Sequence, residues 1–368
     1  MTRTELHTHL MGMLSADRFL NLLANFDYAL PLQYDGKINF ESNKVIRIPA
    51  RDLIGYNKII DQISIKNGSR VNYNDLNEFY YIRSMLLKDL ISELNKASND
   101  DNKVKVYCEY LEESLIELIN QKVEYVEISF SNIKLIDQIM ENVSPKITSK
   151  IKCKFLASTD RSNVAKEFRK SAKNLENLVN KGYSVGFDIM GSETPLTNLD
   201  LDNSSKFGLY QKILPLVETL HNLEHTTLRI HSGETPMSDG NTEKVLHILE
   251  DIERKLGITI PPPSIRIGHG VHFNRSDEYI NLLKKFKCIV EINASSNYAL
   301  GNIKSYYNLP YNYYLDNDIP IVIASDGHGL YDTTKQNEDN IANFVVSDEN
   351  DELIEAIDNY ILDKKKSR

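Results

Sequence analysis

Two histidines lie close to the N-terminus, in the segment Glu5-Leu-His-Thr-His-Leu10. Side chains two residues apart share one face of a β-strand, so His7 and His9, together with Glu5, are expected on one face. Leu6 and Leu10 are expected on the other face, against a helical shell. Two imidazoles on one face of a buried strand are costly unless a metal ion or hydrogen bonds satisfy them. His7 and His9 are therefore candidate metal ligands, with a hydrogen-bonded structural pair as the alternative.

A third histidine ends another apolar run, in the segment Leu228-Arg-Ile-His-Ser-Gly-Glu-Thr235. We expect a strand that ends at His231 and turns at Gly233 to present Glu234. A neutral imidazole is a good third zinc ligand, and a carboxylate three residues later can exchange protons with water or with a substrate. His231 is thus a candidate ligand and Glu234 a candidate proton donor. The alternative for Glu234 is a surface charge.

The next apolar run leads into Arg266-Ile-Gly-His-Gly-Val-His272. His269 lies between two glycines, which let the backbone pass close to a ligand. A histidine in this place can orient an attacking water molecule, or it can be a buried residue that bonds only to backbone. His272, beyond the turn, is expected to be structural.

The run Ile321-Val-Ile-Ala-Ser-Asp326 is apolar until it reaches Ser325 and Asp326. An aspartate at the end of a buried strand needs a charged partner, which a zinc ion supplies; a helix N-cap is the alternative. Three histidine nitrogens and one or two carboxylate oxygens leave one position for water, as catalytic zinc requires. One Zn²⁺ per chain is expected, and because zinc lowers the pKa of water, the expected chemistry is hydrolysis or deamination.

Short β-rich runs alternate with longer stretches of helical periodicity. This alternation favours parallel strands joined by helical crossovers, and eight such units match a (β/α)8 barrel of the α/β class. An open doubly wound sheet is the alternative. The predicted strands are residues 4–10, 123–130, 153–158, 184–190, 228–231, 265–268, 289–294 and 321–325, and the predicted helices include 105–121, 163–181, 204–223, 242–256, 276–285 and 351–361.

The regularity breaks over residues 24–101, a region rich in Asn and Lys whose main helical signal is 76–94. An insertion after the first strand would lie over the carboxyl ends of the strands, where barrel enzymes hold their active sites. It is therefore a candidate substrate lid, with a helical decoration without a catalytic role as the alternative. One domain, 1–368, is expected, because barrels often exceed the usual domain size.

The composition excludes several classes of function. With 43 basic and 52 acidic residues the net charge is −9, which disfavours a nucleic-acid polymer and favours a small-molecule substrate. The three cysteines are far apart, so neither a disulfide framework nor a thiolate zinc site is indicated. Without an apolar signal region or membrane span, a cytoplasmic protein is expected. The sequence does not reveal the oligomeric state, and a homo-oligomer is possible.

In these motifs the chain resembles the adenosine deaminase family, within the amidohydrolase barrels. The resemblance implies zinc ligation by His7, His9, His231 and Asp326. It also implies that Glu234 protonates the purine ring nitrogen next to the attacked carbon, that His269 and Asp326 orient the attacking oxygen, and that the Gly191 N–H meets another ring nitrogen. The motifs are Glu5 to Leu10, Gly186-Phe-Asp-Ile-Met-Gly-Ser-Glu193, His231-Ser-Gly-Glu234, Gly268-His-Gly270, Ser295-Ser-Asn297 and Ser325-Asp326.

Two departures from the family pattern concern substrate contacts, which we expect beside His9 and Gly191. Met11 stands where nucleoside deaminases carry an aspartate that reaches the sugar 5′-hydroxyl, and Gly327 replaces a second aspartate that contacts the purine. His328 is a candidate substitute for that carboxylate or a loop residue. The reaction is therefore expected to be kept, with an adenine nucleoside or nucleotide as substrate. Candidate phosphate ligands, each more often an ordinary surface charge, are Arg47, Arg51, Lys58, Arg70 and Arg83.

Two other functions stay open. A two-metal amidohydrolase usually needs a bridging carboxylate or carbamylated lysine on the fourth strand, and 185–191 holds no lysine, while its Asp188 belongs to the deaminase motif. A catalytically silent purine-binding barrel is also possible, because fold alone does not determine activity. The presence of Glu234 argues against it.

Overall fold

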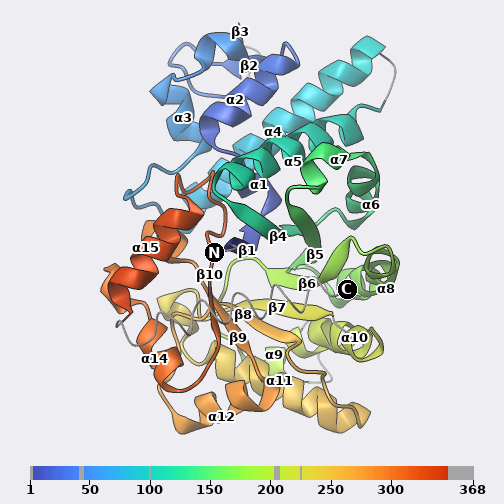
Figure 1. The fold of residues 1–368 in the computed structure, drawn as a ribbon, viewed down its shortest axis with the longest axis vertical. Coiled ribbons are helices and arrows are strands. Elements are labelled where there is room, and N and C mark those ends of the chain that lie inside the picture. The colour runs from blue at the N-terminus through green and yellow to red at the C-terminus, as the bar shows by residue number, and fades with distance from the viewer. Residues whose placement is uncertain (1–2, 41–44, 99–100, 203–207, 224–225, 347–368) are drawn as a thin grey trace.

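Eight parallel strands form the centre of the protein in the computed structural model, which describes residues 3–40, 45–98, 101–202, 208–223 and 226–346. Their order in the sheet is β1-β4-β5-β6-β7-β8-β9-β10, and Figure 1 shows the helices around them. The predicted (β/α)8 barrel is confirmed. The strands are β1 (Arg3–His9), β4 (Val123–Phe130), β5 (Lys152–Asp160), β6 (Ser184–Met190), β7 (Thr227–Ser232), β8 (Ile265–His269), β9 (Ile289–Ile292) and β10 (Ile321–Ile323).

Backbone hydrogen bonds between β1 and the segment after β10 close the barrel. Thr8 forms a parallel bridge with Asp326. The N–H of His9 donates to the carbonyl of Asp326 at 3.2 Å, and the N–H of Asp326 donates to the carbonyl of His7 at 2.9 Å. The alternative of an open sheet is therefore excluded, and closure itself brings both N-terminal histidines beside Asp326.

Amphipathic helices cover the outside of the barrel, as their periodicity predicts. In α5, for example, Val106, Leu111 and Leu115 are buried at helical spacing. The helix that follows β4, α6, packs directly against α5. The helices outside the insertion are α5 (Lys103–Asn120), α6 (Ile133–Asn142), α7 (Pro145–Thr148), α8 (Ala165–Asn180), α9 (Asn198–Leu201), α10 (Leu209–Asn222), η2 (Pro236–Ser238), α11 (Asn241–Leu256), α12 (Asp277–Phe286), α13 (Ala294–Ala299), η3 (Tyr306–Asn308), α14 (Tyr311–Asp316) and α15 (Lys335–Val345).

The expected alternation of side chains along β1 is wrong at Leu6. The register against β4 shifts between Glu5 and Thr8, so that two residues of β1 lie opposite one residue of β4. Such a bulge changes which face the following residues occupy. Leu6 consequently packs in a small cluster with Tyr125, Ile289, Val322 and Ala324, separate from the main core beneath the helices.

The segment between β1 and α5 forms the additional layer at the top of Figure 1, in blue and cyan. It contains an antiparallel pair of strands that the sequence did not predict, and one long helix where helical signals were predicted. That the whole chain, 1–368, is one domain stays a prediction. The elements are α1 (Leu10–Met13), α2 (Ala16–Asn25), β2 (Ala29–Leu32), β3 (Ile46–Pro49), η1 (Ala50–Leu53), α3 (Asn57–Ile63) and α4 (Tyr73–Ser98).

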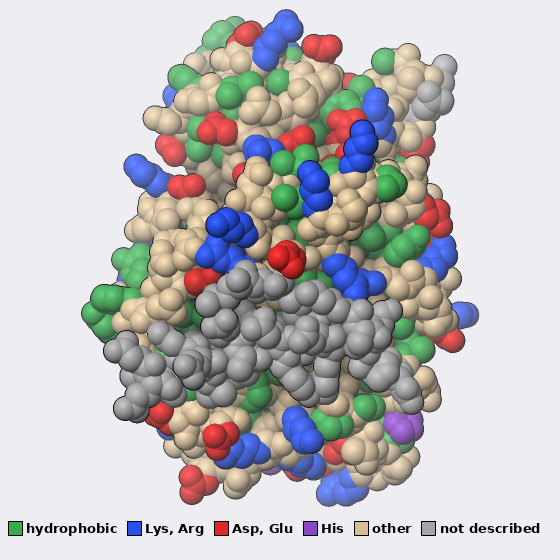
Figure 2. Space-filling model, viewed as in Figure 1, with side chains coloured by type: hydrophobic (Ala, Val, Ile, Leu, Met, Phe, Trp, Pro, Cys, Tyr) green, Lys and Arg blue, Asp and Glu red, His purple; other side chains and the backbone are tan. Residues whose placement is uncertain are grey.

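Most predicted boundaries differ from the observed ones by one or two residues. The predicted helix 351–361 and the first part of 204–223 lie outside the described residues. Among the described helices, none combines the length and apolar character needed to cross a bilayer. On the face drawn in Figure 2, acidic and basic side chains are interspersed rather than separated by sign, which offers no stripe for a phosphate backbone there.

Candidate active site

A cavity of about 320 Å³ lies at the carboxyl ends of the barrel strands. Barrel enzymes hold their active sites at this end, because the loops that follow the strands are free to vary there. Residues from β1, β7, β8 and the chain after β10 meet in its wall. The lining residues are His9, Leu10, Met11, Tyr73, Leu76, Asn77, Tyr80, Ser129, Phe130, Ser131, Ser158, Asp160, Met190, Gly191, Ser192, His231, Glu234, His269, Asp326 and Tyr331.

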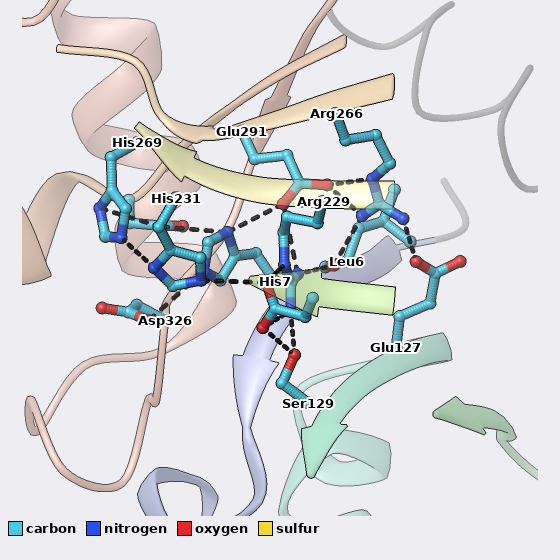
Figure 3. Close-up of polar contacts among 12 residues, drawn as sticks. Leu6, His7, Glu127, Ser129, Arg229, His231, Arg266, His269, Glu291 and Asp326 are labelled. Atoms are coloured by element: carbon cyan, nitrogen blue, oxygen red, sulfur yellow. Dashed lines mark hydrogen bonds and ion pairs between the residues drawn. The ribbon is translucent and has the colours of Figure 1, made fainter. Parts of the chain in front are cut away.

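The four predicted metal ligands lie together at the base of this cavity. Asp326 Oδ1 is 3.2 Å from His9 Nε2 and 3.5 Å from His7 Nε2. The rings of His7 and His231 have their centres 4.8 Å apart. Figure 3 shows the His7, His231 and Asp326 side chains converging, with His269 beside them. The structure therefore brings side chains from both ends of the chain into one cluster.

The donor atoms of this cluster fit a metal ion. Among the described residues, Nε2 of His7 and Nε2 of His231 are buried without a hydrogen-bond partner of good geometry, although nitrogen atoms in such places are normally satisfied. The carboxylate oxygens beside them, Asp326 Oδ1 and Asp188 Oδ1, lie 3.5 and 3.3 Å away. Two ligands of a tetrahedral zinc ion lie roughly 3.3–3.5 Å apart, as the His7, His9 and Asp326 atoms do. Burial lowers the pKa of His7 and lowers that of His231 well below its usual value, so both rings are neutral and can offer a lone pair.

Buried polar side chains surround the candidate metal ligands. Glu291 Oε2 lies 2.8 Å from His7 Nδ1, so a proton on Nδ1 donates to Glu291 and leaves Nε2 for a metal. Asp188 Oδ1 lies 3.3 Å from His231 Nε2. Asp326 is itself held by the hydroxyl of Ser296, which donates to its second oxygen, Oδ2, at 2.6 Å.

Two arginines beneath the ligands neutralise these carboxylates. Arg229, fully buried, donates to Asp188 at 3.0 and 3.1 Å and to Glu291 at 3.3 Å. Arg266 bonds to Glu291 and Glu127. Burial alone would raise the pKa of Asp188 and of Glu291, but the adjacent arginines outweigh it and lower both. The two carboxylates are thus ionised, and the network in Figure 3 is a fixed platform under the metal ligands.

Glu234 lies at the edge of the donor cluster, where a proton donor is needed. Its Oε1 is 3.7 Å from His269 Nε2, which in turn is 3.2 Å from His231 Nδ1. The tight turn that presents it contains Gly233 at φ +68°. The buried carboxylate of Glu193 accepts hydrogen bonds from this turn.

Two of the predicted catalytic residues have unusual backbone conformations. His269 has φ +70° and Asp326 has φ +63°, a region that costs a residue other than glycine about 1–3 kcal/mol. Such strain is tolerated where the surrounding structure holds a side chain in place for function. The residue before His269 is a glycine because a Cβ at position 268 would lie only 2.9 Å from Cε1 of His7.

The long helix of the insertion contributes two tyrosines to the cavity. Tyr73 lies at the start of α4 close to Glu234, and burial together with the charge of that carboxylate raises the pKa of its hydroxyl. Tyr80, two turns later, also lines the cavity; burial and the charge of Asp326 raise its pKa well above the usual value. The insertion thus contributes to the cavity wall. This placement favours the interpretation of the insertion as a substrate lid and disfavours a helical decoration without a catalytic role.

The predicted substrate contacts divide into two groups. Gly191, His9 and Met11 line the cavity. Gly327 and His328 do not line it. Gly327 packs against the backbone of Gly12, where a Cβ would come within 3.1 Å of Cα, so the turn leaves no room for a larger residue without movement. His328 is buried behind the cavity, 3.8 Å from Glu117 Oε2, and does not replace the missing carboxylate.

The candidate phosphate ligands lie elsewhere. Arg47 pairs with Asp89 at 2.8 Å, and Arg70 donates to the carbonyl of Lys304 at 2.7 Å. Arg83 is completely buried and bonds only to backbone carbonyls. None of the five basic residues named from the sequence lines the cavity: Arg47, Arg51, Lys58, Arg70 and Arg83.

Sequence reasoning missed several residues that act beside the ligands. Glu291, Arg229 and Arg266 are charged residues inside apolar strands, and this contrast was a usable signal, because isolated buried charges need partners. Asp160 ends strand β5 in the same way that Asp326 ends the last apolar run, and it also lines the cavity.

Comparisons with known proteins agree with this geometry. The family model described as "Adenosine deaminase" matches residues 108–361, more than half of the chain. The adenosine deaminase of Clostridium botulinum is 22% identical over 349 residues, which are 91% of this chain and 85% of that protein. The adenosine deaminase of Enterococcus faecalis is 26% identical over 150 residues, 41% of this chain but only 36% of that protein.

A solved structure extends the likeness over the whole length. The Arabidopsis N6-mAMP deaminase matches with a TM-score of 0.64 at 18% sequence identity, covering 100% of this chain and 98% of that one. At this identity the likeness is evidence of a shared fold.

Proposed function

The chain belongs to the adenosine deaminase family, and from this premise we propose that it is a zinc-dependent hydrolase that removes the 6-amino group of an adenine nucleoside or nucleotide. The products would be ammonia and an inosine-type purine. Membership of a deaminase family and the barrel fold support hydrolytic deamination in general. The zinc ion and the choice of substrate are part of the proposal.

His7, His9, His231 and Asp326 would hold one Zn²⁺, since Asp326 Oδ1 lies 3.5 and 3.2 Å from the Nε2 atoms of His7 and His9, and the ring of His231 lies beside that of His7. Among the described residues, the Nε2 atoms of His7 and His231 have no hydrogen-bond partner. When bound, zinc lowers the pKa of water toward neutrality and so supplies a nucleophile. The chain's own residues would place that water. Asp326 would accept a hydrogen bond from that water, while the hydroxyl of Ser296 holds its Oδ2 in place. His269 lies beside His231, with the ring centres 5.0 Å apart, and would orient the water from there.

Glu234 would give a proton to the purine ring nitrogen next to the attacked carbon. A protonated ring nitrogen withdraws electrons from that carbon, so the attack on it becomes easier, and the proton stays on this nitrogen in the inosine-type product. The attacking water would give up both of its protons as the new carbonyl forms, one to the leaving amine and one to restore Glu234. The neighbouring Tyr73 hydroxyl and the turn held by Glu193 keep the carboxylate aimed at the cavity. The Gly191 N–H, on the cavity wall, would bind another ring nitrogen.

The observation that carries the proposal is that Glu234 and the candidate metal ligands meet in one cavity. A metal site needs only the ligands, whereas a deaminase also needs a proton donor beside them. The alternative of a silent purine-binding barrel gives no reason for a carboxylate with this placement. A two-metal site is disfavoured because Asp188, the carboxylate on the fourth strand, is already bound by Arg229 and Ser129.

The direct test is ammonia release by the zinc-loaded protein. The substrates are adenine, adenosine, AMP, ATP and their deoxy forms, with guanosine as a control for the position of the amino group. We expect ammonia from at least one adenine compound, with loss of the adenine absorbance band. A zinc-loaded, folded protein that is inert toward every adenine compound would contradict the proposal and favour the silent barrel.

A further inference from the structure

One wall of the cavity carries polar groups that metal binding and proton transfer do not use. Ser158 and Asp160 are two residues apart near the end of β5, and both line the cavity. The hydroxyl of Ser158 is buried and has no hydrogen-bond partner among the described residues. Because buried hydroxyl groups are normally satisfied, this wall is built for a polar ligand.

Asp160 is held with one oxygen free. Its Oδ1 accepts hydrogen bonds from the backbone N–H and the hydroxyl of Ser162, at 2.8 and 2.6 Å. Its Oδ2 has no hydrogen-bond partner in the part of the chain that the structure describes. Oδ2 lies against Gly191, where a Cβ would approach it to 2.5 Å. A fixed carboxylate therefore presents a free acceptor directly beside the glycine proposed to contact the purine.

The charge of the cavity restricts what this acceptor can meet. Among the described residues that line it, none is Lys or Arg, whereas Asp160, Glu234 and Asp326 are acidic. A 5′-phosphate carries up to two negative charges and would lose its hydration here without a cation to replace it. A hydroxyl group, in contrast, donates well to a carboxylate.

Resting on the proposed deaminase function, we propose that Asp160 is a specificity-determining residue that accepts a hydrogen bond from the 2′- or 3′-hydroxyl of the substrate's sugar, and that its charge disfavours a 5′-phosphate. Asp160 thereby supplies a sugar contact in a chain in which Met11 offers none. It binds substrate and transition state alike, so it acts on KM.

The test compares wild type, Asp160→Ala and Asp160→Asn on four substrates: adenosine, 2′-deoxyadenosine, 3′-deoxyadenosine and AMP. Loss of a hydrogen bond to a charged group corresponds to about a 10- to 100-fold fall in kcat/KM. We expect a fall of this size for adenosine in Asp160→Ala, mainly through KM. For the deoxynucleoside that lacks the bonded hydroxyl, the same substitution should change kcat/KM less than about 3-fold, because the contact is already absent.

Controls separate specificity from folding. Asp137→Asn removes a carboxylate from α6 on the outside of the barrel, where it bonds Lys181, and should leave all four values unchanged. Asp160→Asn keeps the acceptor toward Ser162 and should fold with the thermal stability of wild type. Wild type should use AMP at least about 10-fold less well than adenosine.

Two results would overturn the inference: an equal loss on all three nucleosides in Asp160→Ala, or a preference of wild type for AMP. If no substrate releases ammonia, calorimetric binding of the same four compounds tests the Asp160 contact independently of the proposed reaction. Adenosine binding that weakens in Asp160→Ala would keep the inference although the proposed reaction fails. Absence of adenosine binding to wild type would overturn it.

Discussion

The carboxylate of Glu193 accepts a hydrogen bond from the backbone N–H of Glu234, with 2.9 Å between Oε2 and the nitrogen. The same carboxylate accepts from the N–H of Gly233 at 3.1 Å and from the side chains of Ser232 and Asn241 at 3.3 and 3.0 Å. Four donors around one buried carboxylate leave it little freedom. Glu193, which ends a family motif but contacts no substrate atom in our scheme, therefore positions the proton donor.

Glu193→Gln should lower kcat while changing KM little. The amide would turn an N–H donor toward another donor, and the turn that carries Glu234 would move to relieve it. A displacement of this kind near reacting atoms costs about 100-fold in rate. Steady-state kinetics measure it as a fall in kcat at nearly constant KM.

The matched control is Glu112→Gln. Glu112 also accepts from a backbone N–H, that of Ser144 at 2.7 Å, but lies on α5 outside the barrel. It should keep wild-type kinetics. Unchanged kcat in Glu193→Gln, or a fall explained fully by lost zinc, would argue against the positioning role.

Glu234→Gln should abolish turnover and leave zinc in place. Glutamine keeps the shape of the side chain but has no proton to transfer, and general acid–base catalysis contributes about 10²–10⁴-fold. Zinc content is measured by elemental analysis and binding of inosine by calorimetry, and both should match wild type. Turnover within a few-fold of wild type would assign proton transfer to another residue.

Removal of the metal should destabilise the protein, because the ligand cluster then keeps buried nitrogen atoms without partners. A ligand present at 100 times its dissociation constant contributes about 2.7 kcal/mol. We expect the free energy of unfolding to fall by at least roughly this amount after chelation and to recover with Zn²⁺. His231→Ala should bind no zinc and show no further change with chelator. About one zinc per chain is expected; two would return the proposal to a two-metal hydrolase.

Much of the site could be predicted from the sequence because polar residues at the ends of buried apolar strands are easy to recognise. An apolar run such as Ile321–Ile323 must be buried, and the first acidic residue after it, Asp326, must then find a partner at the mouth of the barrel. The same logic locates His231 at the end of β7. Parallel strands bring all such ends to one side, so residues far apart in the chain converge.

What failed depends on contacts that no local pattern encodes. Leu6 changes face because of a bulge whose existence depends on the register with β4. His328 follows Asp326 closely, but the turn after Asp326 directs it toward Glu117 instead of the cavity. The role of Tyr73 depends on how α4 docks over the barrel, which is a result of tertiary packing.

Arg83→Met should destabilise the protein strongly. The buried guanidinium of Arg83, on α4, donates to the carbonyls of Met11, Leu14, Ile63 and Gly329, and so ties α4 to α1 and the residue after it, to the end of α3 and to the loop after β10. Each buried carbonyl left without a donor costs about 1–3 kcal/mol. Denaturant unfolding should show a loss of roughly 3 kcal/mol or more. Arg47→Met, on the surface, is the control and should stay within about 1 kcal/mol of wild type. A stable Arg83→Met protein would show that this tie is dispensable.

Glu338→Gln should make the protein less sensitive to rising pH. Burial raises the pKa of Glu338 above its ordinary value of 4.5, although Ser295 and Thr333 donate to it. The folded protein therefore holds this proton more tightly than the unfolded chain. The resulting stabilisation is complete below pH 4.5 and is lost as the pH rises through the raised pKa. Glutamine mimics the protonated form and removes this loss, so relative to wild type the variant should gain free energy of unfolding as the pH rises above 4.5, by about 1.4 kcal/mol for each unit by which the pKa is raised. Glu278→Gln, an exposed residue on α12, should follow wild type. Parallel pH profiles for Glu338→Gln and wild type would mean that Glu338 is ionised throughout.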